Sequence, residues 1–144
     1  MKFVLDTMLG HLLTWLRLLG YDTIYAGDVD DDELLSLSLK ENRVLVTRDR
    51  KLAAKSAKNG IKAVLLENVE VVECLLKIAE QTGINLQFRP ENSRCPACNE
   101  ILVKAEDVPT RWKCPGCLKE YWVGRHWKNI KKVLDILEEK SFGR

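Results

Sequence analysis

The stretch "RVLVTRDRKL", residues 43–52, decides how this chain folds. A run of apolar and β-branched residues, Val44 to Thr47, stops abruptly at Arg48-Asp49-Arg50. Such a run is typical of a strand that is buried on both faces of a parallel sheet. A helical pattern, "RKLAAKSAK", follows directly and ends beside Gly60, a residue type that favours helix ends. The stretch therefore predicts a strand that passes straight into a helix, with a carboxylate at the junction.

The same alternation runs through the first 90 residues. Predicted strands cover residues 2–5, 22–26, 43–47 and 61–67. Predicted helices fall within residues 8–20, 27–43, 50–60 and 69–83. Strand–helix repeats with short connections predict an α/β fold, in which a mainly parallel sheet is flanked by helices and the crossovers are right-handed. The order of the strands is not readable from this pattern.

The chain changes character near residue 90. Residues 85–93, "NLQFRPENS", are expected to form a last strand or an extended linker, and their Pro and Asn mark a boundary. We therefore expect two domains, residues 1–90 and residues 91–144. The first carries a net charge of −1 and the second a net charge of +3. This uneven charge is typical of a protein with a polyanionic partner, although a solvated charged surface would give the same count.

The sequence also bears on the compartment. No window approaches the roughly 18 apolar residues of a membrane span. The first residues, "MKFVLDTMLG", lack the apolar core and the cleavage site of a signal peptide. We expect a soluble cytoplasmic protein without a membrane partner. Its oligomeric state stays open, with a homodimer as one alternative.

Four of the five cysteines form two C-x-x-C pairs, Cys95/Cys98 and Cys114/Cys117, separated by fifteen residues. This spacing is typical of a zinc site in which two tight turns aim four thiolates at one ion. A closed four-cysteine site is structural rather than catalytic. Reduced thiols in a small core are an alternative, but the segment is short and polar, and iron is a less common occupant. The sequence therefore predicts a structural zinc site, and it predicts that Cys74 is a packed thiol.

Basic and aromatic residues interleave in and after the cysteine segment. They are Arg94, Lys104, Arg111, Trp112, Lys113, Lys119, Tyr121, Trp122, Arg125, His126, Trp127 and Lys128. Cations that meet phosphates and rings that stack on bases would suit a nucleic-acid strand. For Trp112 and Trp122 we favour packing within the small domain, and for Arg125 and Lys128 we favour nucleic-acid binding.

A last apolar stripe follows the cysteine segment. Trp127, Ile130, Leu134 and Leu137 stand at helical spacing. The stripe predicts a terminal helix that docks on the rest of the protein.

Acidic residues follow three predicted strands in a row. Asp6, Asp28 and Asp49 lie at or just beyond the strand ends, and residues 30–33 add an acidic run after the second strand. In open α/β sheets, ligands bind at the carboxyl ends of the strands. Neighbouring strands are only about 4.8 Å apart, so acids at adjacent strand ends can approach one another. An oxygen-only cluster suits Mg²⁺ or Mn²⁺, which can activate water and neutralise charge developing on a phosphodiester. Helix capping explains each acid singly, but it does not predict acids after three consecutive strands.

Four stretches stand out when they are taken together: "FVLDTMLGHLLTWLRLLGYDTIY", "DDELLSLS", "RVLVTRDRKL" and "RCPACNEIL…CPGCLKEYWVGRHW". Together they resemble the Mut7-C ribonuclease family, which has a PIN-like domain followed by a zinc ribbon. The resemblance spans nearly the whole chain, in the same order and spacing. It implies a PIN-type fold with acids at the C-terminal edge of a parallel sheet, and metal-dependent endonucleolytic cleavage of RNA.

The resemblance also implies roles for single residues. Asp6, Asp31 and Asp49 look like the first three acids of the family, which would hold Mg²⁺ or Mn²⁺. Typical PIN nucleases have a fourth acid, and Glu67, at the end of the fourth predicted strand, is the one candidate for it.

Three hypotheses for function follow. The first is a hydrolase for single-stranded or looped RNA. In it the three acids bind one or two metal ions, Arg48, Arg50 and Lys51 hold flanking phosphates, and the zinc ribbon helps to bind the RNA. The second is a non-catalytic RNA-binding or assembly module on the same scaffold. The third is a zinc-stabilised adaptor for protein interactions.

Overall fold

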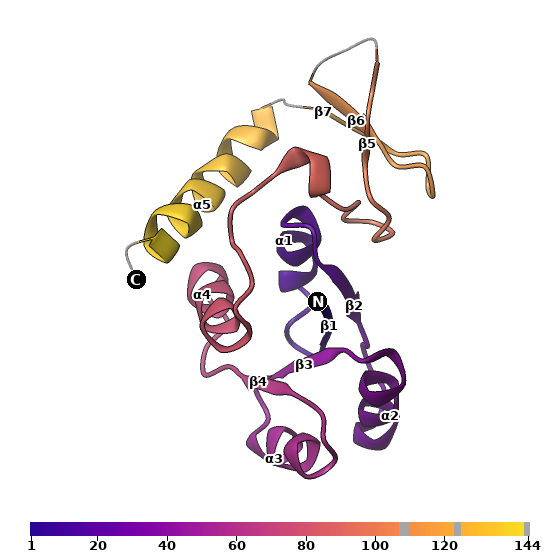
Figure 1. The fold of residues 1–144 in the computed structure, drawn as a ribbon, viewed down its shortest axis with the longest axis vertical. Helices are drawn as coiled ribbons and strands as arrows, with labels where there is room; N and C mark the ends of the chain where they lie inside the picture. The colour runs from indigo at the N-terminus through magenta and orange to yellow at the C-terminus, as the bar shows by residue number, and fades with distance from the viewer. Residues whose placement is uncertain (107–109, 123–124, 143–144) are drawn as a thin grey trace.

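A four-stranded parallel sheet lies at the centre of the molecule (Figure 1). The computed structural model describes residues 1–106, 110–122 and 125–142, without the side chains of Arg125, His126 and Phe142. The strands are β1 (Lys2–Leu5), β2 (Asp22–Tyr25), β3 (Val44–Thr47) and β4 (Ala63–Leu65). Their order is β2-β1-β3-β4, and every neighbouring pair is parallel. The predicted α/β fold is therefore confirmed, and the first strand lies between the second and the third.

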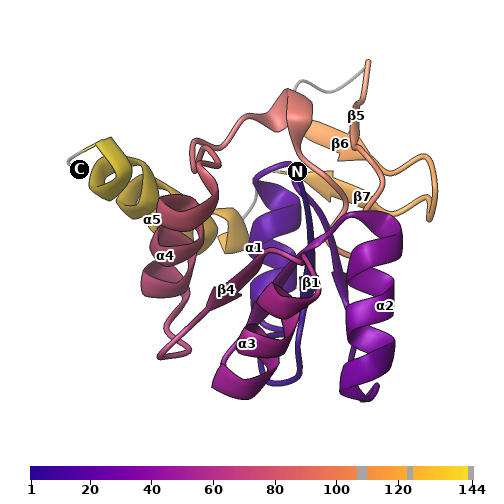
Figure 2. The same cartoon turned by 60° about the horizontal axis from the view of Figure 1, so that its bottom comes forward.

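Helices cover both faces of this sheet (Figure 2). Helices α1 (Leu12–Leu18), α4 (Val71–Thr82) and α5 (Arg125–Phe142) lie on one face, and α2 (Asp31–Glu41) and α3 (Arg50–Lys58) lie on the other. Side chains alternate between the faces of a strand. Phe3 and Leu5 of β1 accordingly join the core under α1 and α4, whereas Val4 joins the core under α2 and α3.

Local chemistry sets where the helices begin. Asp30 caps α2, because its side chain accepts a hydrogen bond from the backbone N–H of Glu33 at 2.8 Å. Asp49 caps α3 in the same way, as described below. Helix α1 begins later than the sequence predicted, because Met8 adopts a left-handed conformation with φ 72° that interrupts a helix.

The segment after α4 crosses to the ribbon without forming a strand. Residues 84–89 join no described ladder, so the linker alternative holds, and a short 3-10 helix, η1 (Pro90–Asn92), follows. The ribbon is an antiparallel sheet in the order β5-β6-β7. Its strands are β5 (Val103–Lys104), β6 (Arg111–Lys113) and β7 (Glu120–Trp122).

Helix α5 returns to the parallel sheet and packs beside α4 (Figure 1). Leu134 and Leu137 are buried in the main core, and Trp127 and Ile130 pack against its margin. The predicted docking stripe is therefore confirmed. The division at residue 90 stays a prediction, and the last helix shares its core with the first part of the chain.

Among the described residues, no helix has both the length and the apolar character needed to cross a membrane.

Candidate active site and metal centre

Three strand ends meet at one edge of the parallel sheet. Strand β1 lies between β2 and β3. The connection leaving β1 passes through α1 on one face, and the connection leaving β3 passes through α3 on the other. In a doubly wound sheet of this order, ligands bind where the connections diverge, at the carboxyl ends of β1 and β3. Asp6 follows β1 directly, and its backbone N–H donates to the carbonyl of Val46 in β3 at 3.0 Å. Asp6 therefore stands at the switch point of the fold.

A buried threonine joins Asp6 to Asp49. The Thr47 hydroxyl donates to Oδ2 of Asp6 at 2.7 Å, and it accepts from the backbone N–H of Asp49 at 3.0 Å. Oδ1 of Asp6 accepts from the backbone N–H of Thr7 at 2.8 Å. Because Thr47 has no exposed surface, its hydroxyl depends on protein groups such as these two for its hydrogen bonds. The side chain fixes the Asp6 carboxylate and the backbone that carries Asp49.

Asp49 is a helix cap and is not held by its neighbouring arginines. Oδ1 accepts from the backbone N–H groups of Lys51 at 2.9 Å and Leu52 at 3.3 Å. Among the described residues Asp49 has no ion pair, and Oδ2 accepts no hydrogen bond. Arg48 instead donates to the carbonyl of Glu67 at 3.1 Å. The carboxylate therefore keeps one oxygen free for a ligand.

The acids after β2 lie on the first turn of α2. Asp31 is exposed and has no side-chain hydrogen bond or ion pair in the described part of the chain. Asp30 is the cap, and Asp32 pairs with Lys55 at 2.8 Å. Of the three aspartates in this run, Asp31 is thus the one whose carboxylate has no hydrogen bond or ion pair in the described part of the chain. Asp28 is exposed on the loop before α2.

The three carboxylates do not form a closed cation site as they stand. Oxygen ligands of Mg²⁺ lie about 2.1 Å from the ion, so two of them are at most about 4.2 Å apart. Among the described residues, the four ribbon cysteines are the one group of at least three metal-ligating side chains within 4.8 Å of one another. The donor chemistry of Asp6, Asp31 and Asp49 suits a hard cation, but in this arrangement the three carboxylates are not within the reach of one ion. Their role in metal binding stays a prediction.

Cations border the acid edge. Arg48, Arg50 and Lys51 are exposed, and the two arginines line a shallow depression together with Glu67. Glu67 is exposed and lies after β4. Two further predicted RNA-binding residues are on α5, where Lys128 is exposed and the side chain of Arg125 lies outside the described residues.

The four ribbon cysteines converge on one point. All four are free, and their sulfur atoms lie within 4.8 Å of one another. Sγ of Cys95 is 3.7 Å from Sγ of Cys117, and Sγ of Cys98 is 3.1 Å from Sγ of Cys114. Tetrahedral zinc with Zn–S bonds of 2.3 Å places its sulfurs about 3.8 Å apart, whereas a disulfide needs about 2.05 Å. The cluster could therefore bind zinc.

Hydrogen bonds prepare one of these thiols for a metal. Burial raises the pKa of Cys95, but hydrogen bonds from the Tyr121 hydroxyl and from the backbone N–H groups of Cys98 and Ala97 lower it to about 6. Metal ligation requires the thiolate.

The two C-x-x-C turns have the same backbone. In each, the residue after the second cysteine is left-handed, Asn99 with φ 76° and Leu118 with φ 66°. The N–H of that residue donates to the carbonyl of the first cysteine, at 2.8 Å from Asn99 to Cys95 and at 2.9 Å from Leu118 to Cys114. Each turn is thus a preformed loop that presents two sulfurs.

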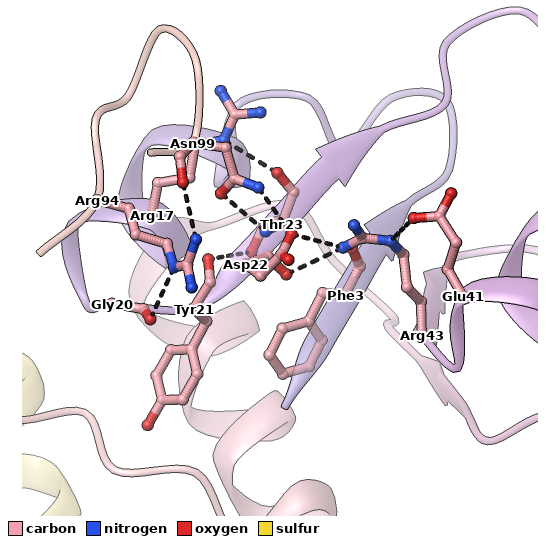
Figure 3. A network of polar contacts seen from close by, with 10 residues as sticks. All are labelled: Phe3, Arg17, Gly20, Tyr21, Asp22, Thr23, Glu41, Arg43, Arg94 and Asn99. Atoms are coloured by element: carbon pink, nitrogen blue, oxygen red, sulfur yellow. Dashed lines mark hydrogen bonds and ion pairs between the residues drawn. The ribbon is translucent and has the colours of Figure 1, made fainter. Parts of the chain in front are cut away.

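The first turn is fixed to the parallel sheet by a polar network, part of which Figure 3 shows. Asn99 donates to Oδ1 of Asp22 at 2.7 Å and accepts from the backbone N–H of Thr23 at 3.2 Å. The same Asp22 oxygen accepts from Nη1 of Arg43 at 2.8 Å. The Asp22 carboxylate therefore joins strand β2, the start of β3 and the ribbon.

A buried arginine supports the metal centre from the other side. Arg17 of α1 donates to the carbonyl of Thr23 at 2.9 Å and to the carbonyl of Pro96, inside the first turn, at 2.7 Å. Burial lowers the pKa of Arg17, and the thiols of Cys95 and Cys98 oppose that shift. A zinc ion held by four thiolates carries net negative charge, so the guanidinium would compensate it.

The cysteine cluster and the acidic residues lie at opposite ends of the parallel strands. The ribbon contacts the beginning of β2 and the end of α1, through Asp22, Thr23 and Gly20, whereas the acids follow the strand ends. Figure 2 shows the ribbon at the end of the sheet where β1 starts. A four-residue strand spans about 13 Å, which sets the scale of the separation.

Fold and site together define a class: a doubly wound α/β domain with carboxylates at its switch point, joined to a four-cysteine ribbon that could hold zinc. The family model of the Mut7-C RNAse domain matches residues 1–134. The chain therefore belongs to the Mut7-C RNAse domain family, and the predicted membership is confirmed. No curated protein and no solved structure gives a significant match to the chain.

Some features of the sites were not predicted. Thr47 was assigned only to the strand, and Arg17 and Arg43 were not singled out, although a charged residue in an otherwise apolar element is a signal for a buried partner. The packing role holds for Trp112, which joins the small cysteine core. It is wrong for Trp122, which is 65% exposed: its neighbour Tyr121 packs on the cysteine core, so Trp122 points to the other face of β7.

Proposed function

We propose that this protein is a metal-dependent endoribonuclease that hydrolyses phosphodiester bonds of single-stranded or looped RNA at the Asp6–Asp49 edge. The observation that carries the proposal is the Thr47 bridge, which joins the Asp6 carboxylate to the backbone of Asp49 at the switch point of a ribonuclease-family fold. Neither carboxylate has an ion pair among the described residues, so both remain available to a cation.

Residues at this end of the sheet would have three roles: holding the metal ion, orienting a metal ligand and binding phosphates. Asp6 and Asp49, with Asp31, would hold Mg²⁺ or Mn²⁺. When bound, such a cation lowers the pKa of water and neutralises charge developing on the phosphorus oxygens. Thr47 would keep the Asp6 carboxylate oriented toward the edge. Arg48, Arg50 and Lys51 would bind the phosphates on either side of the cleaved bond.

The ribbon would assist from a distance. Because it sits at the opposite edge of the sheet, it would hold a strand of RNA away from the cleaved bond rather than contact that bond. A structural zinc and a cytoplasmic location are part of the same proposal.

The test is cleavage of defined RNAs in the presence of Mn²⁺. Asp6→Asn and Asp49→Asn should each lower the rate by on the order of a hundredfold or more, because charge stabilisation by the metal is worth several kcal/mol. Asparagine still caps a helix, so Asp49→Asn should fold normally. Asp135→Asn is the matched control, since Asp135 lies on α5 and pairs only with Lys131 among the described residues. Unchanged cleavage by a folded Asp6→Asn/Asp49→Asn double variant would overturn the proposal.

A second candidate has a specific observation in its favour. The three carboxylates are not gathered within the reach of one ion, which suits a non-catalytic RNA-binding module. That module would bind RNA in a salt-dependent manner and cleave nothing with Mn²⁺. Calorimetry with Mn²⁺ separates the two, because only the nuclease should lose heat of binding in the Asp6→Asn variant.

A further inference from the structure

A pocket of about 360 Å³ lies where the ribbon meets the α/β domain. Its walls come from α1, the linker, the ribbon and the start of α5. The aromatic residues that line it are Phe88, Trp112, Tyr121, Trp122 and Trp127. This volume falls within the range of about 300–1,000 Å³ that is typical of ligand sites. None of the acids at the switch point lines this pocket.

The aromatic walls are partly fixed and partly open. The rings of Phe88 and Trp127 are 5.1 Å apart at an angle of 53°, which holds one wall in place. Trp112 packs on the cysteine cluster, which holds another. Trp122, in contrast, is 65% exposed. A ring left open beside fixed rings offers a face on which a planar ligand can stack.

A polar group on the pocket wall has no partner. Ser93 lines the pocket and is 3% exposed, and its Oγ makes no hydrogen bond within the part of the chain that the structure describes. A buried hydroxyl without a partner is unfavourable. Rotation about χ1 of serine could turn this hydroxyl toward a ligand that carries a donor or an acceptor.

Three cations neighbour aromatic residues of the pocket wall. In the ribbon sheet Lys104 is in register with Trp112, and Arg111 is in register with Trp122, so each cation lies beside a ring. Lys128 follows Trp127 on α5 and is exposed. An apolar peptide would leave these charges without partners. A nucleotide satisfies both features, because its base is planar and its phosphate is negative.

We propose that this pocket binds an unpaired base of the RNA strand, stacked on Trp122, with the flanking phosphates on Lys104, Arg111 and Lys128. This base site rests on the proposed function, since it takes RNA as the partner, and it deepens that function by naming how the ribbon holds the strand. It predicts that the bases themselves contribute to affinity without sequence-specific recognition of the cleaved bond.

The test compares two oligomers of equal length and charge, oligouridylate and its abasic ribose-phosphate counterpart. Binding is measured by fluorescence anisotropy without added Mg²⁺ or Mn²⁺, so that the measurement does not depend on cleavage. The ratio of the two affinities reports the contribution of the bases. Trp122→Ala should lower this ratio by between about fivefold and a hundredfold, the range for loss of one stacked base. Ile101→Ala, a similarly exposed ribbon residue outside the pocket, should leave the ratio unchanged.

Intrinsic fluorescence gives an independent readout. Three of the four tryptophans line the pocket, so oligouridylate should quench the emission of a Trp15→Phe variant and the abasic oligomer should not. An equal ratio in wild type and Trp122→Ala would overturn the base site while leaving RNA cleavage at the acids intact. Absence of binding to either oligomer would overturn both the base site and the RNA partner. If the affinity ratio behaves as expected but cleavage does not depend on Asp6 and Asp49, only the nuclease assignment is overturned.

Discussion

Thr47 is the residue on which the geometry of the candidate active site depends. Thr47→Val keeps the shape of the side chain and removes the hydroxyl that bonds to Asp6 and Asp49. We expect cleavage to fall by between about tenfold and a hundredfold, as for other groups that orient metal ligands. We also expect a loss of about 1–3 kcal/mol in the free energy of unfolding, because the N–H of Asp49 and an oxygen of Asp6 lose their partner.

The control for this experiment is Thr47→Ser, which retains the hydroxyl and should recover most of the cleavage rate. Wild-type cleavage by Thr47→Val would mean that the bridge has no part in the reaction.

The five cysteines should differ sharply in reactivity. Cys74 is buried, and burial raises its pKa to about 11. Because only the thiolate reacts, and the thiol stays protonated well below pH 11, Cys74 should resist alkylation at pH 8. In the zinc-loaded protein the other four thiolates should be protected by the metal. Mass spectrometry should find no rapid labelling before chelation, four labels after it, and the fifth only in denaturant. Four labels without a chelator would show that the ribbon holds no metal.

For single residues, the sequence predicted where the acidic side chains lie, but it did not predict the role of the Thr47 hydroxyl. The placement of Asp6 and Asp49 at the same end of the sheet could be predicted, because each stands within two residues of the end of a buried strand. Thr47 could not, because threonine is an ordinary strand residue and its partner, Asp6, is 41 positions away.

Among the elements, the two C-x-x-C turns have the same conformation but different residues at the left-handed position. Asn99 tolerates this conformation well, whereas Leu118 does not. Leu118 is also 65% exposed, so it gains little from burial. Leu118→Asn should therefore stabilise the ribbon, by about 1 kcal/mol.

Competition with a chelator that binds zinc measures this effect, because tighter folding of the turn should slow zinc release. Asn99→Leu, the reverse exchange, should weaken the ribbon more, since Asn99 also bonds to Asp22 and Thr23. Faster zinc release from Leu118→Asn would contradict the claim that the left-handed conformation of Leu118 destabilises the turn.

The elements were predictable where apolar periodicity defines them. All four strands of the parallel sheet and the helices between them were expected, because short runs rich in apolar or β-branched residues alternate with longer helical patterns. The ribbon strands have no such signal. Strand β5 has two residues, both exposed, so the cysteine spacing predicts the ribbon while alternation of side chains does not. Strand order could not be predicted, because similar apolar strands pair equally well in several orders.

At the scale of the whole molecule, α5 closes the main core. Leu137 is fully buried, and its removal leaves a cavity between α5 and the sheet domain. Leu137→Ala should lower the free energy of unfolding by about 2–5 kcal/mol. Ile136, the adjacent residue, is 41% exposed, so Ile136→Ala should change stability by much less.

Thermal unfolding followed by circular dichroism measures both variants. We expect one transition that moves to lower temperature for Leu137→Ala. A transition confined to α5, with the parallel sheet melting at the wild-type temperature, would contradict a shared core.

The late position of α5 in the chain bears on synthesis as well as on stability. The strand at the centre of the sheet, β1, emerges from the ribosome first, but the apolar face formed by α1 and α4 is covered only when Leu134 and Leu137 arrive. At about 5–20 residues per second, the time between Leu9 and Leu137 is roughly 6–25 s. During that interval the nascent chain exposes part of its largest apolar surface. The growing chain should therefore be prone to aggregation, and should profit from chaperones, until α5 is made.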